Sequence, residues 1–153
     1  MGNIFNKDFC DFIEAFNHFN VEYILVGGYS VILHGYSRTT GDLDIWVNQT
    51  KENYERIKKA FGLFGMPLFE MTETNFLQNK DFNVFTFGRP PVSLDIMTEV
   101  KGLNFRDCFN ESKMTVVDKI SVRLIDYNHL LKAKKSSGRS KDLDDLENLS
   151  EGK

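Results

Sequence analysis

Two aspartates one residue apart open the apolar run "DLDIWV", residues 42–47, and this pattern restricts the possible folds most. Aspartate is disfavoured inside strands and is costly to bury, so a positive partner or a metal ion must compensate it. Because side chains alternate along a strand, Asp42 and Asp44 share one side while Leu43 and Ile45 take the other. The run predicts a strand that is acidic on one face and apolar on the other.

A third acid, Asp95, stands in another apolar run, "VSLDIM". If that run is a strand beside residues 42–47, three carboxylates converge on one face. Neighbouring carboxylates repel each other by roughly 1 kcal/mol or more, and a divalent cation removes that repulsion. Three such acids are what two-metal phosphoryl or nucleotidyl transfer needs. The structural alternative is that Asp42 caps a turn and Asp44 faces water on an edge strand.

A glycine pair, Gly27-Gly28, follows the apolar run "EYILV" where a strand gives way to a helix. Backbone N–H groups at such a turn can hold phosphate, and glycine lets the backbone approach a ligand closely. Ser30 adds a hydroxyl. Many strand-to-helix turns use glycine for packing alone, so this signal gains weight only beside the acids.

Hydrophobic periodicity predicts a mixed α/β (α+β) domain. Helices are expected at 9–19, 29–36, 51–64, 68–80 and 105–109, then from Tyr127 to about Ser136, and from Ser140 with Leu143, Leu146 and Leu149 on its inner face. Strands are expected at 22–28, 42–47, 82–88 and 92–97, followed by a hairpin at 114–125 that turns at Asp118-Lys119. We expect a single domain, 1–153, with the helical segment 126–150 packing on it.

The composition fits one globular domain, with 153 residues of which 41% are hydrophobic and 27% charged. The 14 phenylalanines are expected to fill the core. A net charge of −3 argues against a nucleic-acid coat or a basic membrane-surface protein. Cys10 and Cys108 form neither a disulfide framework nor a zinc pattern. Without a signal peptide or a membrane-length apolar run, we expect a cytoplasmic protein with reduced thiols and no membrane partner.

Three motifs together resemble the nucleotidyltransferase superfamily typified by DNA polymerase beta. They are Val26-Gly27-Gly28, then Asp42-Leu43-Asp44-Ile45 after a spacer from Tyr29 to Gly41, and Asp95 on a later strand. The runs "HGYSRTTGDLDIWV" and "LLKAKKSSGRSKDLDDLENL" are similar to the minimal bacterial branch that includes abortive-infection toxin-type nucleotidyltransferases. The resemblance spans Tyr23 to Leu149, although residues 48–80 carry no motif.

The resemblance implies a polymerase beta-like fold, a mixed β-sheet flanked by helices, and transfer of a nucleoside monophosphate from an NTP to an acceptor hydroxyl. The implied catalytic residues and Mg²⁺ ligands are Asp42, Asp44 and Asp95, with Asp95 as the base toward the acceptor. Mn²⁺ is the alternative metal, and ATP is the expected nucleotide. The implied nucleotide-binding residues are Gly27, Gly28, Ser30, Arg38, Lys134 and Arg139, with Lys141 as a further positive charge.

Several of these residues also have a structural interpretation. A Lys-rich helix end is commonly a solvated face that suits the helix dipole, which applies to Lys134 and Lys141. Asp142 and Asp145 are expected to be first-turn helix acids that pair with the basic residues. His34 and Trp46 are expected to be structural.

Large members of this superfamily close the cleft with a second helical domain, for which this chain has little material. We therefore expect a homodimer or a partner protein that covers the active face. The acceptor stays open among a small molecule such as an aminoglycoside-type or lincosamide-type drug, tRNA, and a protein hydroxyl. The resemblance further implies a toxin–antitoxin or phage-defence role. The alternative is a catalytically inactive nucleotide-binding or protein-interaction module with the same fold.

Overall fold

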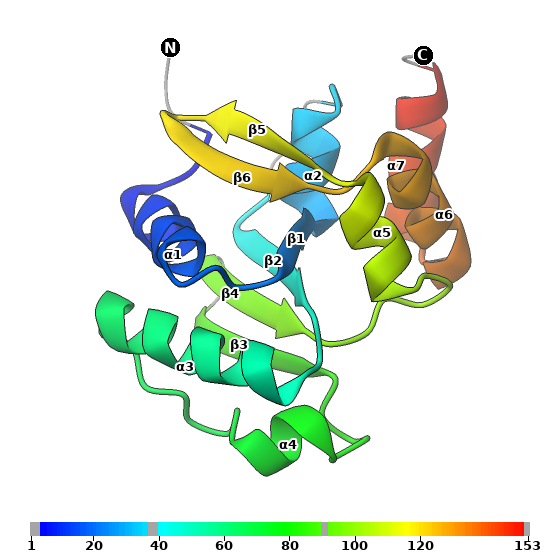
Figure 1. The fold of residues 1–153 in the computed structure, drawn as a ribbon. Coiled ribbons are helices and arrows are strands. Elements are labelled where there is room, and N and C mark those ends of the chain that lie inside the picture. Colours follow the sequence, from blue (N-terminus) through cyan, green and yellow to red (C-terminus); the bar gives the residue numbers. More distant parts are fainter. Residues whose placement is uncertain (1–3, 37–39, 90–91, 152–153) are drawn as a thin grey trace.

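The computed structural model describes residues 4–36, 40–89 and 92–151 (Figure 1). Within them, six strands form one sheet in the order β3-β4-β2-β1-β6-β5. The strands are β1 Tyr23–Val26, β2 Asp42–Val47, β3 Val84–Arg89, β4 Val92–Met97, β5 Lys113–Val117 and β6 Ile120–Leu124. Two pairs, β2–β4 and β1–β6, are parallel, and the other three are antiparallel. The predicted mixed sheet is confirmed.

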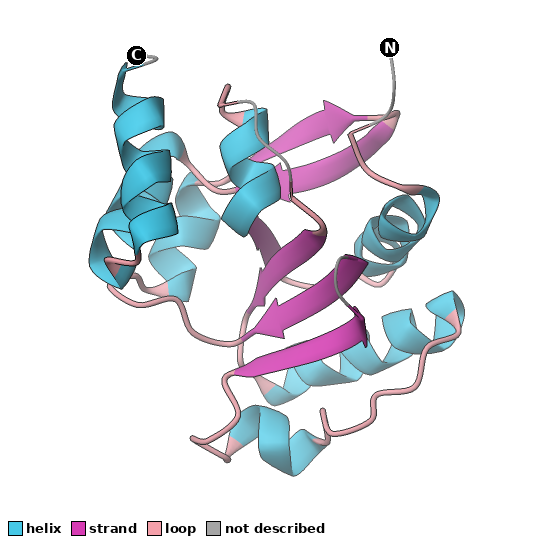
Figure 2. Cartoon of the chain, turned by 180° about the vertical axis from the view of Figure 1, so that it is seen from behind, coloured by secondary structure: helices cyan, strands magenta, loops and turns pink. Residues whose placement is uncertain are grey.

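The helices within the described residues are α1 Lys7–His18, α2 Gly27–Leu33, α3 Lys51–Phe64, α4 Glu73–Leu77, α5 Phe105–Glu111, α6 Tyr127–Ser137 and α7 Ser140–Glu151. Asn6 and Thr50 cap α1 and α3 through side-chain oxygens that accept backbone N–H groups. Gly138 ends α6 in the left-handed conformation. In Figure 1, α1 and α3 lie on one side of β2 and β4, and α6 and α7 lie on the other; Figure 2 shows the same layers from behind.

The core lies between the sheet and the pair α1–α3. Leu43 and Ile45 of β2 are fully buried there. The Phe61 ring on α3 lies 5.5 Å from that of Phe12 on α1 and 5.0 Å from that of Phe87 on β3. Edge-on contacts of this kind add to the burial of apolar area. The expectation that the phenylalanines mainly fill the core is confirmed for this cluster.

Two sequence expectations about helices are wrong. Residues 68–80 are helical only at Glu73–Leu77, because Phe69 takes a positive φ of 49° and Thr72 caps the helix that starts after it. On α7, Leu149 is buried as expected, but Leu143 is 48% exposed while Asp142 and Asp145 are buried. The buried ion pairs of these acids therefore place them, and not Leu143, on the inward face.

None of the helices in the described residues combines the length and the apolar character needed to cross a membrane.

Candidate active site

The pairing of β2 with β4 gathers the three predicted acids. The strands run parallel, with Asp44 opposite Asp95 and Asp42 opposite Ser93. Paired residues point to the same side of a sheet, so the three carboxylates share one face. They lie on the face opposite Leu43, as the alternation along the strand predicts.

Hydroxyl groups hold two of the carboxylates. The Ser93 Oγ donates to Asp42 Oδ1 over 2.7 Å, and the Thr86 Oγ1 donates to Asp95 Oδ1 over 2.7 Å. Thr86 reaches Asp95 because β3 pairs with β4 at that register. One oxygen of each carboxylate is thus oriented by a neighbouring strand, which limits the rotamers that each acid can adopt.

Gly27 lies directly against the Asp44 carboxylate. It is the first residue of α2 and has a φ of +71°. A Cβ built on Gly27 would stand 1.9 Å from Asp44 Oδ2, far inside van der Waals contact. Both the positive φ and this close approach require glycine, so the backbone after β1 runs immediately beside the acidic face.

The environment of Asp44 disfavours its charged form. Burial, the charge and hydrogen bond of Asp95, and the charge of Asp42 together raise the pKa of Asp44 to about 7, against a smaller opposing effect of Lys134. The positive charge of Lys134 therefore does not offset the effect of burial and of the neighbouring carboxylates on Asp44. A bound cation would supply the missing charge.

Basic residues approach from the opposite side, on α6, on α7 and in the turn between them. Lys134 is buried, with Nζ 3.0 Å from Asp142 Oδ1 and 3.2 Å from Asp145 Oδ2. Arg139 Nε lies 2.5 Å from Asp142 Oδ2. Burial alone would raise the pKa of Asp142, but hydrogen bonds from Arg139, Ser137 and Lys134 outweigh it and lower the pKa to about 2. The predicted pairing of Asp142 and Asp145 with basic residues is confirmed.

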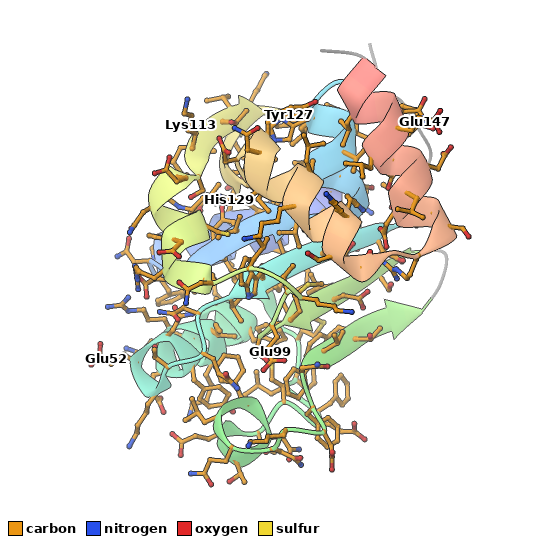
Figure 3. All side chains as sticks on the ribbon, turned by 90° about the vertical axis from the view of Figure 1, so that its right-hand side faces the viewer. Glu52, Glu99, Lys113, Tyr127, His129 and Glu147 are labelled. Carbon is orange, nitrogen blue, oxygen red and sulfur yellow. The ribbon has the colours of Figure 1, made fainter. Side chains whose placement is uncertain are left out.

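A cavity of about 410 Å³ separates the acidic face from these helices. Figure 3 views the molecule from their side, with Tyr127 and His129 labelled on α6. The predicted site residues that line the cavity are Gly27, Asp42, Asp44, Asp95, Lys134, Arg139 and Lys141. Residues that are far apart in the sequence thus come together, with Asp42, Asp44 and Asp95 on one wall and the three cations, accompanied by Asp142, on the other.

Other predicted site residues lie elsewhere. Ser30 is fully buried and its hydroxyl donates to the Gly27 carbonyl over 2.6 Å, so it supports the turn from behind. Gly28 is buried in the same turn. Arg38 lies outside the described residues.

The two residues expected to be structural are placed accordingly. His34 Nε2 is hydrogen-bonded to the Ile125 carbonyl over 2.7 Å. Trp46 is 1% exposed and packs edge-on against Phe105 at 5.2 Å. Neither lines the carboxylate cavity.

Three residues that were not predicted, Thr86, Ser93 and Ser137, donate hydrogen bonds that orient the acids. A signal for Ser93 was present, because it precedes Asp95 by two residues and therefore shares its face. Thr86 could be found only from the β3–β4 register, and Ser137 only from the packing of α7 against α6. Both depend on contacts that local patterns do not specify.

The acids suit a divalent metal ion by their chemistry. Within the described ranges, no group of three or more His, Cys, Asp or Glu side chains already stands in an arrangement that would hold a metal. The donor set is nevertheless three carboxylates on one cavity wall, and oxygen donors are what Mg²⁺ prefers. Burial first, and then the charges of Asp95 and Asp42, raise the pKa of Asp44, and a bound cation would favour the charged form of this carboxylate.

Comparisons with known proteins relate this chain to others by structure. No family model matches the chain, and no curated protein matches its sequence. The lincosamide antibiotic adenylyltransferase LnuA, solved with lincomycin bound, matches with a TM-score of 0.54 and 17% identity, covering 97% of this chain and 98% of that chain. TM1012 from Thermotoga maritima, provisionally named a nucleotidyltransferase, matches with a TM-score of 0.55 and 12% identity, covering 93% and 89%. The chain therefore shares its fold with these two proteins.

Proposed function

We propose that this protein transfers a nucleoside monophosphate from an NTP to an acceptor hydroxyl, with Mg²⁺ or Mn²⁺. The observation that carries the proposal is the convergence of Asp42, Asp44 and Asp95 on one wall of a cavity whose other wall is basic. The fold shared with two proteins named for nucleotidyl transfer supports the same class of reaction.

The three aspartates would hold the metal ion. When bound, the metal would lower the pKa of the acceptor hydroxyl and offset charge on the triphosphate. Asp95 is half-buried beside the exposed Thr86, and we assign it as the base that would take the proton of an acceptor arriving over β3. Asp44, the most crowded of the three, contributes the charge that a cation must neutralise.

The NTP would lie between the glycine turn and the basic wall. Gly27 brings the backbone beside Asp44, and Gly28 and Ser30 support that turn. The Arg139 side chain is 73% exposed although Asp142 anchors it, so it and Lys141 can approach phosphate. Lys134 is the buried cation whose charge acts on Asp44.

Arg38 is included as a nucleotide-binding residue only because its sequence motif resembles that of the nucleotidyltransferase superfamily.

ATP and a small hydroxyl compound are the first substrates to test. LnuA is named as a lincosamide adenylyltransferase, and the match covers nearly all of both chains. Transfer to tRNA or to a protein hydroxyl stays within the proposal. A toxin–antitoxin or phage-defence role rests on the sequence resemblance to toxin-type members.

A binding module without turnover is the second candidate. It is favoured by the pairing of Lys134 with two buried aspartates, because a cation already neutralised has less attraction left for a triphosphate. Such a module would bind NTP and release no pyrophosphate. The two candidates therefore differ in one measurable product.

The deciding experiment supplies each NTP, labelled at the α-phosphate, with Mg²⁺ or Mn²⁺ and either a cell extract or a panel of small hydroxyl compounds. We expect label to move from one NTP to one acceptor class with release of pyrophosphate. Asp95→Asn should lower the rate at least about 10³-fold, while Asp81→Asn, an exposed acid outside the cavity, should leave it unchanged. NTP binding by calorimetry with no labelled product under any condition would favour the module.

A further inference from the structure

One hydroxyl group of the chain itself lies against the acid assigned above as the base. Thr86 is on β3, the edge strand next to β4, and its side chain is exposed. Its Oγ1 lies 2.7 Å from Asp95 Oδ1, within the ~2.6–3.2 Å over which a general base can take a proton from its substrate. Thr86 therefore has its hydroxyl where the acceptor hydroxyl of the proposed reaction would have to lie.

The strand register brings Thr86 to the face of the sheet that borders the carboxylate cavity. Thr86 pairs with Asp95, and Val84 pairs with Met97. Because Val84 and Thr86 are two positions apart, their side chains lie on the same face of β3. Val84, Asp95 and Met97 all line the cavity, and Figure 1 shows β3 beside β4 at one margin of the sheet. The cavity wall thus extends onto β3, directly beside Thr86.

The hydrogen bond directs the Thr86 proton toward the acid. An ionised carboxylate can only accept hydrogen bonds, so the threonine hydroxyl is the donor to Asp95. The lone pairs of Thr86 Oγ1 consequently point away from Asp95. A hydroxyl within hydrogen-bond reach of a base is the pairing that activates serine and threonine nucleophiles.

Exposure distinguishes Thr86 from the other hydroxyl that binds one of the three acids. Among the hydrogen bonds of the described residues, Ser93 Oγ also donates to a member of the set, Asp42 Oδ1, over 2.7 Å. Ser93 is only 5% exposed, and β4, which carries it, lies between β3 and β2. A phosphate group can approach the exposed Thr86 but not the buried Ser93.

We propose that Thr86 is an acceptor for the nucleotidyl transfer of its own chain, so that the protein modifies itself. This inference rests on the proposed function. The bond from Thr86 Oγ1 to the α-phosphorus of the NTP forms, and the bond from that phosphorus to the oxygen bridging to the β-phosphate breaks. Pyrophosphate leaves with the electron pair of that bond. The hydroxyl proton passes to Asp95, and a nucleoside monophosphate remains on Thr86 as a phosphodiester.

The placement of donor, base and cavity in one chain has two measurable consequences. The reaction is intramolecular, so the fraction of protein modified at a given time does not depend on protein concentration. The attached nucleotide also covers Asp95, and it therefore blocks that base toward any other acceptor. Self-modification thus competes with transfer to an external hydroxyl and ends the activity of the chain that undergoes it.

Mass spectrometry of the full chain tests the proposal without knowledge of the external acceptor. The protein is incubated with each NTP, labelled at the α-phosphate, and with Mg²⁺ or Mn²⁺ but no added acceptor. We expect the intact mass to rise by one nucleoside monophosphate and peptide mapping to place it on Thr86, to the same extent across a dilution series. Asp95→Asn should slow this labelling at least about 10²-fold.

Three threonine variants separate the role of an acceptor from a structural one. Thr86→Val should remove the label, because it removes the nucleophile. Thr86→Ser should keep the label at position 86, because it restores a hydroxyl on the same backbone. Thr74→Val, which alters an exposed threonine of α4 outside the cavity, should be labelled like wild type.

The same incubations show how the proposal could fail. A label mapped to another residue, a label retained by Thr86→Val, or a modified fraction that grows with protein concentration would overturn it. If the chain passes label to an external acceptor and carries none itself, self-modification is excluded while the proposed function stands. If label reaches neither the chain nor any acceptor, the proposed function and this inference are both wrong.

Discussion

On one face of β2, Leu43 and Ile45 are fully buried under α3 and α1; on the other, Asp42 and Asp44 line a cavity below α6 and α7. The same alternation holds in β4, where Ile96 is buried and Asp95 faces the cavity. Residues one position apart therefore meet opposite environments. Burying a charge without a partner costs several kcal/mol. The acidic residues therefore destabilise β2 and β4, and the apolar side chains on the other face of the same strands offset that cost.

Within each of these strands, the residues on the apolar face contribute to stability and those on the acidic face are proposed to carry the chemistry. The apolar face is held by aromatic and aliphatic contacts that tolerate no charge. On the acidic face, burial and the neighbouring carboxylates disfavour the ionisation of Asp44 and raise its pKa. Substitutions on the two faces should therefore alter different measurable quantities.

The largest effect is expected from Asp44→Asn, measured as the rate of nucleotidyl transfer. The amide keeps the shape of the side chain but removes the charge beside Asp95, so the rate should fall at least about 10³-fold. Circular dichroism and thermal melting should show a folded protein that is no less stable than wild type. A variant that retains transfer would contradict the assignment of this face to chemistry.

The next largest effect is expected from Ile45→Ala, measured as the free energy of unfolding. The side chain is fully buried, and its truncation should cost about 3 kcal/mol through lost burial and a cavity. The transfer rate of the protein that remains folded should stay close to that of wild type. If this variant loses turnover while its stability is unchanged, the proposed division between the faces is wrong.

A pH-dependent effect on stability should distinguish the acidic face from the apolar one. In the metal-free protein the pKa of Asp44 is raised from its usual 3.8 to about 7. The folded state therefore binds a proton more readily than the unfolded state between those values. The contribution of Asp44 to the free energy of unfolding is therefore greatest below about pH 4, and it is lost as the pH rises to about 7.

Asp44→Asn should accordingly stabilise the metal-free protein by ~1–3 kcal/mol at about pH 7.5, and by less at about pH 5. Urea unfolding in the presence of a chelator measures both values. Mg²⁺ should reduce the stability advantage of Asp44→Asn over wild type, because the metal stabilises the complete carboxylate cluster of the wild-type protein. A pH-independent difference would mean that the carboxylates do not crowd one another in the folded state.

Local patterns predicted most of the fold and part of the site. The alternation in "DLDIWV" predicted the faces of β2, and the helices expected from residue 51 and from Ser140 begin where the structure has them. The length of α4 and the inner face of α7 could not be predicted, because they depend on a strained residue and on ion pairs that form only after folding. Thr86 and Ser137 escaped prediction for the same reason, since their roles arise from tertiary contacts.

The smallest effect is expected from Lys141→Ala, and it tests the basic wall opposite the acids. Lys141 lines the cavity but is exposed, so water and salt screen its charge. We expect the KM for the NTP to rise only about threefold at low salt, with kcat unchanged, and the difference to vanish as ionic strength increases. Lys135, an exposed lysine on α6 that does not line the cavity, gives the matched control Lys135→Ala. Equal effects of the two substitutions would mean that only the overall charge of these helices matters, and that no specific phosphate contact exists at Lys141.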